Sequence, residues 1–137
     1  PAYPSHREFD DPISQSVREH FIPAIEESLE HVAFVLEHHD HTYKRTHPLR
    51  GGKVINNTAV DVAEGSADSN ERGLVYIGDG ALGVSESSRE AYQSRAYIEV
   101  AKSENYFLGI VVLPNRSMAC VAHEGESGEV MDSYSRT

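Results

Sequence analysis

A run of five apolar residues, residues 32–36 (VAFVL), is followed within two positions by three histidines and an aspartate in residues 38–41 (HHDH). Five residues are too few for a surface helix, and such a run is typical of a strand buried on both faces of a mostly parallel sheet. Ligands of open α/β sheets bind at the carboxyl ends of the strands, because the chain leaves the core there. We therefore expect the histidines to lie at a ligand-binding edge of the sheet.

The spacing of the histidines predicts which of them act together. If the chain stays extended, His39 and His41 point to one side, and His38 and Asp40 point to the other. Two neutral imidazoles on one side can bind one divalent metal ion or two adjacent ions. A histidine run can also be a solvated loop, in which any metal binding reflects only the local abundance of histidine and not a built site. The position after a buried strand is what favours a metal site here.

The segment from His38 to Thr46 (HHDHTYKRT) resembles the G-H-x-H-x-Y-x-R segment of calcineurin-like metallophosphoesterases, in particular the purple acid phosphatase branch. Other blocks of the family agree with this chain in order and spacing. These blocks are residues 1–5, 75–81 and 128–134. Residues 1–5 are similar to the part of an H-x-P-x-Y-x-S motif that follows its histidine. The resemblance covers nearly the whole chain and is specific at residues 37–46 and 74–83.

The resemblance implies a dinuclear metal centre that hydrolyses phosphate esters. His41 would bind the first metal ion, which is Fe(III) in the family, and His39 the second, which is Fe, Zn or Mn. Three further residues would orient the ligands or contact the substrate: Asp40, Tyr43 and Arg45. Arg45 could equally well balance neighbouring carboxylates. His6 is the nearest candidate to protonate the leaving group or to hold phosphate, and a solvent-exposed loop histidine is an equal interpretation of it.

The chain also departs from the family pattern. His38 stands where the family has a glycine, and the aspartates of the G-D-x-x and G-D-x-x-Y motifs and the asparagine of G-N-H are missing. The histidine of H-x-P would lie two residues before Pro1. We therefore interpret residues 1–137 as the C-terminal portion of one metallophosphoesterase domain. The N-terminal half would be a necessary partner, and the isolated chain would be inactive.

Length and charge narrow the classes of function. A chain of 137 residues suits one domain. Its net charge of −10 argues against a nucleic-acid-binding surface and against anionic membranes. A phosphate site in such an acidic chain needs local positive charge, which metal ions would supply. Cys120 lies in an apolar run and is expected to be a buried small hydrophobic residue. The resemblance alone implies an extracellular or periplasmic location.

The N-terminal part of the chain predicts a helix that leads into the strand. Asp11 is a suitable N-cap, with Pro12 at the first helical position. Every fourth residue is then apolar: Ile13, Val17, Phe21, Ile25 and Leu29. Pro23 should kink this helix or split it at Ile22. A helix followed by a buried strand is half of a βαβ unit, so we expect the first strand of that unit upstream of Pro1.

The second half of the chain predicts mostly strands. A polar insertion or loop at about residues 53–72 precedes a short strand at residues 74–77, which ends in a glycine-rich turn. Four more strands, joined by short turns, should form an antiparallel meander: residues 96–101, 106–113, 118–123 and 129–134. The expected fold class is α/β, as the C-terminal half of a metallo-dependent phosphatase-like α/β/β/α sandwich, with a helix and a buried strand followed by this meander.

Two rival interpretations remain open. One is a noncatalytic β-rich interaction fragment whose histidine cluster is incidental, and the missing carboxylate ligands favour it for this chain by itself. The other is a mononuclear metal hydrolase that uses His38, His39 and His41, which the alternation of an extended chain disfavours. The number of metal ions bound by the full-length protein, two, none or one, separates the three interpretations.

Overall fold

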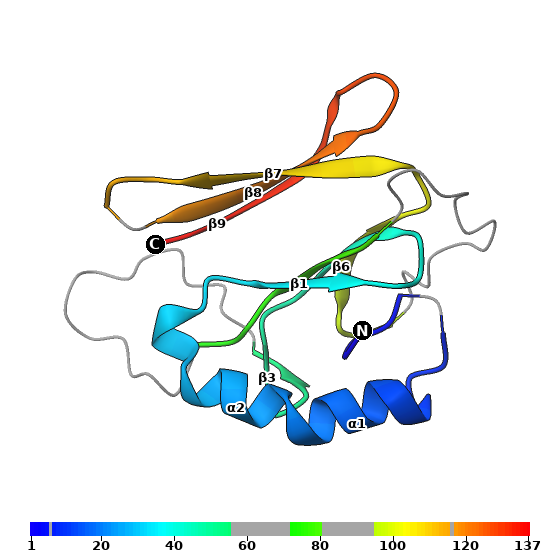
Figure 1. The fold of residues 1–137 in the computed structure, drawn as a ribbon, viewed down its shortest axis with the longest axis vertical. Coiled ribbons are helices and arrows are strands. Elements are labelled where there is room, and N and C mark those ends of the chain that lie inside the picture. Colours follow the sequence, from blue (N-terminus) through cyan, green and yellow to red (C-terminus); the bar gives the residue numbers. More distant parts are fainter. Residues whose placement is uncertain (6, 56–71, 81–94, 116) are drawn as a thin grey trace.

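The computed structural model describes residues 1–5, 7–55, 72–80, 95–115 and 117–137. The described part of the chain is a mixed α/β structure arranged in three layers (Figure 1). Two helices form one outer layer, a four-stranded sheet lies in the middle, and a three-stranded sheet forms the other outer layer. The α/β class predicted from the sequence is confirmed.

The predicted helix is present and is broken where proline was expected to break it. It consists of α1 (Pro12–His20) and α2 (Ile22–Glu27), followed by a 3-10 turn at Leu29–His31. Asp11 caps α1, because its Oδ1 accepts hydrogen bonds from the amides of the second and third helical residues at 3.1 Å each. Pro23 has no amide to donate back into the preceding turn, and the helix divides at Phe21, one residue before the predicted position of Ile22. None of the helices in the described residues is long and apolar enough to cross a membrane.

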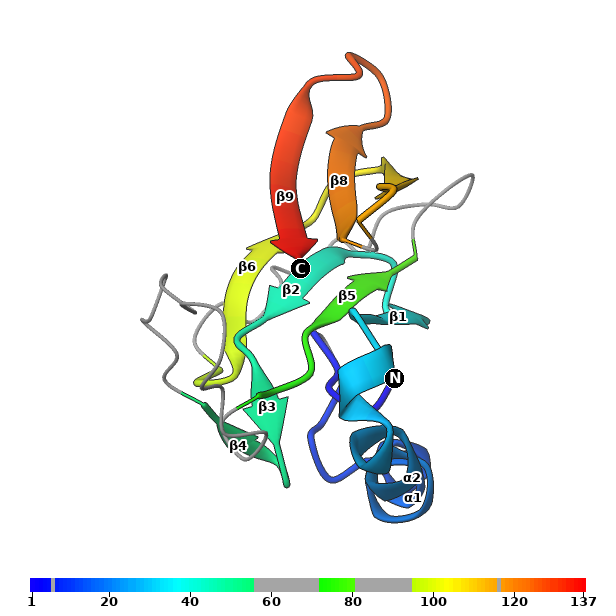
Figure 2. The same ribbon diagram turned by 90° about the vertical axis from the view of Figure 1, so that its left-hand side faces the viewer.

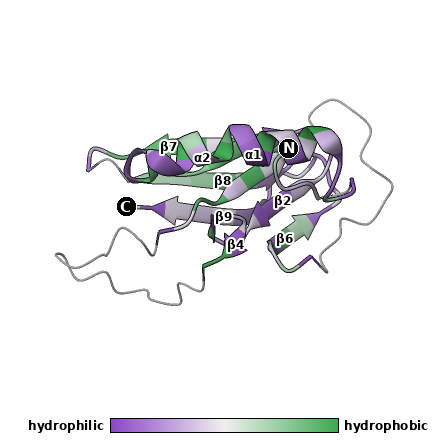
Figure 3. Cartoon of the chain, turned by 90° about the horizontal axis from the view of Figure 1, so that it is seen from below, coloured by the Kyte–Doolittle hydropathy of each residue, from purple (hydrophilic) through white to green (hydrophobic). Residues whose placement is uncertain are grey.

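The predicted apolar stripe is confirmed in part. Val17, Ile25 and Leu29 pack in or against the core cluster on the helix side of the sheet. Ile13 and Phe21, in contrast, are 68% and 64% exposed, and Ile22, outside the stripe, is only 4% exposed and packs in the core. Figure 3 shows hydrophobic and hydrophilic residues side by side along both helices.

The middle sheet has the strand order β1-β5-β2-β6. Its strands are β1 (Val35–His38), β5 (Tyr76–Asp79), β2 (Tyr43–Thr46) and β6 (Ile98–Lys102). β1 is parallel to β5, while β2 is antiparallel to both of its neighbours, as can be followed in Figure 2. A small hairpin of β3 (Leu49–Arg50) and β4 (Lys53–Val54) follows β2, and the rest of the predicted polar insertion, residues 56–71, lies outside the described residues.

The strand buried on both faces is β5, and the prediction that residues 32–36 form such a strand is wrong. Residues 74–77 have no exposed surface, and a strand was correctly predicted there. In contrast, β1 begins only at Val35, lies at the edge of the sheet, and leaves Leu36 40% exposed. An apolar run indicates burial, but it does not show how many strands will flank the segment. In the described sheet β1 pairs on one side only, with β5.

The outer sheet is an antiparallel meander of β7 (Tyr106–Val112), β8 (Met118–Glu124) and β9 (Val130–Arg136). All four strands predicted in this part of the chain are present, which confirms them as strands. The first of them, however, does not belong to the meander: β6 pairs with β2 in the middle sheet. The chain therefore changes sheets between β6 and β7, and a turn signal in the sequence does not distinguish this change from a hairpin.

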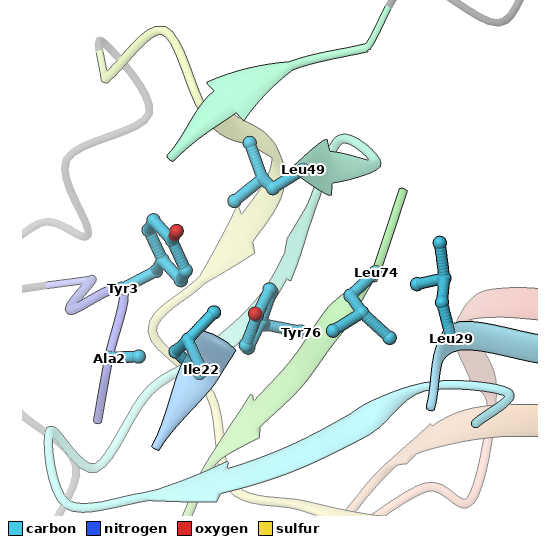
Figure 4. Close-up of a cluster of buried hydrophobic side chains, with 7 residues drawn as sticks. All are labelled: Ala2, Tyr3, Ile22, Leu29, Leu49, Leu74 and Tyr76. Atoms are coloured by element: carbon cyan, nitrogen blue, oxygen red, sulfur yellow. The ribbon is translucent and has the colours of Figure 1, made fainter. Parts of the chain in front are cut away.

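Alternation along β5 divides the core in two. Tyr76 points toward the helices and joins a cluster that Figure 4 shows in full: Ala2, Tyr3, Ile22, Leu29, Leu49, Leu74 and Tyr76. Val75 and Ile77 point the other way, into a cluster between the two sheets that includes Cys120. The prediction that Cys120 is a buried small hydrophobic residue is confirmed, since it is 2% exposed and burial raises the pKa of its thiol.

A half-buried carboxylate, Asp132 of β9, joins the outer sheet to the middle sheet. It accepts hydrogen bonds from the Tyr43 hydroxyl and the Arg45 Nε, both at 2.6 Å, and a third from the Arg45 Nη2 at 3.2 Å. Burial would raise the pKa of Asp132, but these hydrogen bonds outweigh it and hold the pKa below its ordinary value. The carboxylate is therefore stabilised in its charged form.

Asp132→Asn should destabilise the fold by roughly 1–3 kcal/mol near neutral pH, because it removes the charge that Arg45 binds. The folded-state pKa of Asp132 is lowered, so its contribution is present above about pH 4 and is lost as the pH falls through the folded-state pKa. Urea unfolding of both proteins at neutral and at acidic pH measures this, with exposed Ser133→Ala as the control on the same strand. A destabilisation that is the same at both pH values would contradict the expected role.

Candidate functional site

The histidines lie on a tight turn between two strands. β1 ends at His38 and β2 begins at Tyr43, and the intervening residues bend instead of staying extended. His39 and His41 have positive φ angles of 156° and 57°. A non-glycine residue in the left-handed region costs about 1 kcal/mol or more, and such strain is common at functional sites. The predicted alternation of the histidine side chains is therefore wrong, because it assumed an extended chain.

The turn brings all three histidines to one cavity. The cavity has a volume of about 550 Å³, and His38, His39 and His41 line it. Its remaining wall is mostly apolar and comes from three strands or strand ends: Leu36, Gly80, Tyr106, Phe107, Leu108 and Ile110. The expectation that His39 and His41 lie on the same side agrees with this arrangement. The expectation that His38 faces away from them is wrong.

A glycine allows the backbone after β5 to approach the histidine turn. Gly80 has a φ of +69°, and a Cβ atom placed on it would lie 2.8 Å from Nδ1 of His38. Its amide donates a hydrogen bond of 2.7 Å to the hydroxyl of Tyr106, which is part of the cavity wall. The turn after β5 therefore lies against both His38 and Tyr106 in the cavity wall.

Asp40 lies behind the turn, where it is buried and binds Arg7. The Arg7 Nε donates to Oδ1 of Asp40 at 3.1 Å, and the Arg7 amide donates to Oδ2 at 3.3 Å. The Arg7 Nη2 lies 2.8 Å from each ring nitrogen of His39, and Nδ1 of His39 is 3.6 Å from Asp40 Oδ1. His39 therefore faces both a cation and a carboxylate. A metal ion on His39 would need Arg7 to move away.

A buried ion pair supports the turn from the side of the helices. Lys44 is fully buried, and its Nζ donates to Oε2 of Glu37 at 2.7 Å and to the carbonyl of Tyr3. Oε1 of Glu37 accepts a hydrogen bond from the Ala2 amide at 2.5 Å. Gly78 of β5 is in register with both partners, so their side chains meet over a residue without a side chain.

No motif in the sequence identifies Lys44 and Glu37 as partners. The pairing depends on β5 inserting between β1 and β2, so it could not be found from the spacing of Glu37 and Lys44. Gly78 is the one local signal, because a Cβ atom there would lie 2.5 Å from the carbonyl of Glu37.

Two of the predicted site residues lie elsewhere. The polar groups of Tyr43 and Arg45 bind Asp132 between the two sheets, and Arg45 also binds Glu99 at 2.5 Å. Tyr43 approaches the cavity only through its ring, which contacts Tyr106 edge-on at a centroid distance of 5.1 Å. Of the two interpretations of Arg45, the structure agrees with the balancing of neighbouring carboxylates. His6 lies outside the described residues.

The cavity offers imidazole nitrogens as its principal metal donors. Among the described residues, no three or more histidine, cysteine, aspartate or glutamate side chains are arranged so that they could hold one metal ion together.

Comparison of the chain with protein-family models, with curated proteins and with solved structures finds no match in any of the three.

Lys44→Met should destabilise the fold by roughly 3–5 kcal/mol, because it leaves the Glu37 carboxylate buried without its counter-charge. Replacing both partners, Glu37→Gln with Lys44→Met, should recover most of that loss, since no unpaired charge remains. Urea unfolding measures both variants, and Lys53→Met at an exposed position of β4 is the control. A double variant as unstable as Lys44→Met would show that the ion pair is not the cause.

Proposed function

We propose that this chain supplies the histidine-bearing half of a metal-dependent phosphoesterase, in which a dinuclear centre hydrolyses phosphate esters. The observation that supports this function best is the gathering of His38, His39 and His41 around one cavity at the carboxyl end of β1. The segment from His38 to Thr46 adds its resemblance to the corresponding segment of purple acid phosphatase-like enzymes.

The imidazole nitrogens in the cavity are suitable ligands for these metal ions, but they are too few to complete a dinuclear centre. His39 and His41 would each provide one imidazole nitrogen, as neutral side chains that are exposed to the cavity. When bound, two metal ions, Fe with Fe, Zn or Mn, neutralise the charge of the ester and lower the pKa of bound water. Asp40 holds Arg7 next to the cavity, where its guanidinium can neutralise phosphate.

The remaining ligands would come from the N-terminal half of the same domain. The described layers are helices, a mixed sheet and an antiparallel sheet, and we propose that they form the C-terminal half of a metallo-dependent phosphatase-like α/β/β/α sandwich. The other half would add the outer helical layer and the carboxylate and amide ligands that are missing here. The isolated chain would then be inactive.

A mononuclear hydrolase is the second candidate, and one observation favours it. All three histidines line the same cavity, so the alternation that disfavoured His38 as a ligand no longer applies. A noncatalytic interaction fragment with an incidental histidine cluster is the third. Elemental analysis of the full-length protein distinguishes the three, with two, one or no metal ions per chain.

In the full-length protein, His39→Ala and His41→Ala should each lower turnover of a phosphate ester by at least about a hundredfold and reduce the metal content, while the fold is retained. Circular dichroism and elemental analysis of each variant accompany the activity assay. The control is His47→Ala, because His47 lies outside the cavity, 3.7 Å from Glu99. Full activity in either cavity variant would rule out the proposed ligands.

In the isolated chain, Arg7→Met should raise the affinity for Zn²⁺ by roughly tenfold, because it removes the cation that faces His39 and releases the carboxylate of Asp40. Isothermal titration with ZnCl₂ measures the change, and the starting affinity should be weak. Adding His39→Ala to Arg7→Met should cancel the gain. An affinity that stays the same or falls in Arg7→Met would contradict binding at His39.

A further inference from the structure

The outer edge of β1 presents backbone groups that suit another strand. β1 pairs with β5 on one side, and the amide of Val35 donates to the carbonyl of Val75 at 2.9 Å. Because amides alternate in direction along a strand, those of Leu36 and His38 point to the opposite, outer side. A strand edge of this kind readily pairs with a further strand.

Apolar cavities lie on both faces of this edge. The histidine cavity lies on the side of the outer sheet, and a second cavity of about 330 Å³ lies on the side of the helices, where Phe21 and Ile25 line it. Leu36 lines both cavities and is 40% exposed. Figure 2 shows that the helices lie beneath β1 at this side of the molecule. An occupant must therefore present apolar side chains to two faces, which a buried strand does and an amphipathic helix does not.

The position of Pro1 gives the direction of such a strand. Pro1 lines the second cavity, and the amide of Ala2 is bound by Glu37 near the carboxyl end of β1. A strand that led directly into Pro1 would end beside Glu37 and so would run parallel to β1. With α1 and α2 between the two strands, this arrangement is a βαβ unit. The last residues of the added strand would lie beside His38.

Charge argues against a second copy of this chain as the occupant. Each copy carries a net charge of −10, so two copies repel each other when their β1 edges approach. We propose that the outer edge of β1 pairs, in parallel, with an apolar strand of the N-terminal half of the protein. The assignment of this strand to the N-terminal half rests on the proposed function, whereas the pairing itself requires no metal ion.

The test extends the 137-residue chain ahead of Pro1 by a designed strand, Lys-Ser-Val-Val-Ile-Val-Val-Gly, and measures amide hydrogen exchange by NMR without metal. The amides of Leu36 and His38 should exchange at least about tenfold more slowly than in the unextended chain, because they become hydrogen-bonded. A control extension, Lys-Ser-Val-Pro-Ile-Pro-Val-Gly, has prolines that cannot donate to the edge and should give no protection.

A pair of matched variants tests the place of docking. Leu36→Lys should abolish the protection in the extended chain, whereas Leu113→Lys, at a similarly exposed residue beyond the end of β7, should leave it unchanged. The proposal is overturned by unchanged exchange at Leu36 and His38, by equal protection from the proline control, or by protection of β7 instead. Protection that rises with the concentration of the unextended chain would identify a second copy as the occupant and also overturn it. A failure to bind metal would leave this result intact and would count only against the proposed function.

Discussion

The buried ion pair of Lys44 with Glu37 is the contact on which the arrangement around the histidines depends. An ammonium without exposed surface is unfavourable unless its charge and its hydrogen bonds are satisfied, and here the Glu37 carboxylate and the Tyr3 carbonyl satisfy them. The pair crosses β5 at Gly78 and so links β1 to β2. It also binds the first residues of the chain to the sheet through the amide of Ala2. Both ends of the histidine turn are thereby held in place.

This constraint explains how the site is organised. The turn must connect two strands that flank β5, in a distance too short for an extended chain, so His39 and His41 take positive φ angles. Their imidazoles then face the same cavity as His38, and the opposite wall is formed by β7 of the other sheet. Strained backbone of this kind is common at functional sites. The same edge of the sheet thus carries both the histidines and the open backbone groups of β1.

Local signals in the sequence predicted the local structure well. The cap at Asp11, the break at Pro23 and the strands of the second half are each determined by residues next to them in the chain. The choice of strand partners is not local. Residues 32–36 and 74–77 look alike in the sequence, yet β5 became the central strand and β1 the edge, because burial depends on what packs against each strand.

The candidate site could be predicted only in part, because its geometry also depends on contacts between residues far apart in the sequence. The expectation that His39 and His41 share one side agrees with the cavity that both line, but the position of His38 depends on the backbone of a turn that no glycine marks. Tyr43 and Arg45 were placed at the site because they are close to it in the sequence. Alternation along β2 sends both toward Asp132, which lies 87 residues after Arg45.

The most direct test of the metal site is the ¹⁵N chemical shift of each histidine ring nitrogen during titration of the labelled chain with ZnCl₂. We expect the ring nitrogens of His39 and His41 to shift together and to saturate at the same zinc concentration, while those of His47, outside the cavity, stay unchanged. Equal, unsaturated shifts for all histidines, or no shift at His39 and His41, would contradict a metal site at the end of β1.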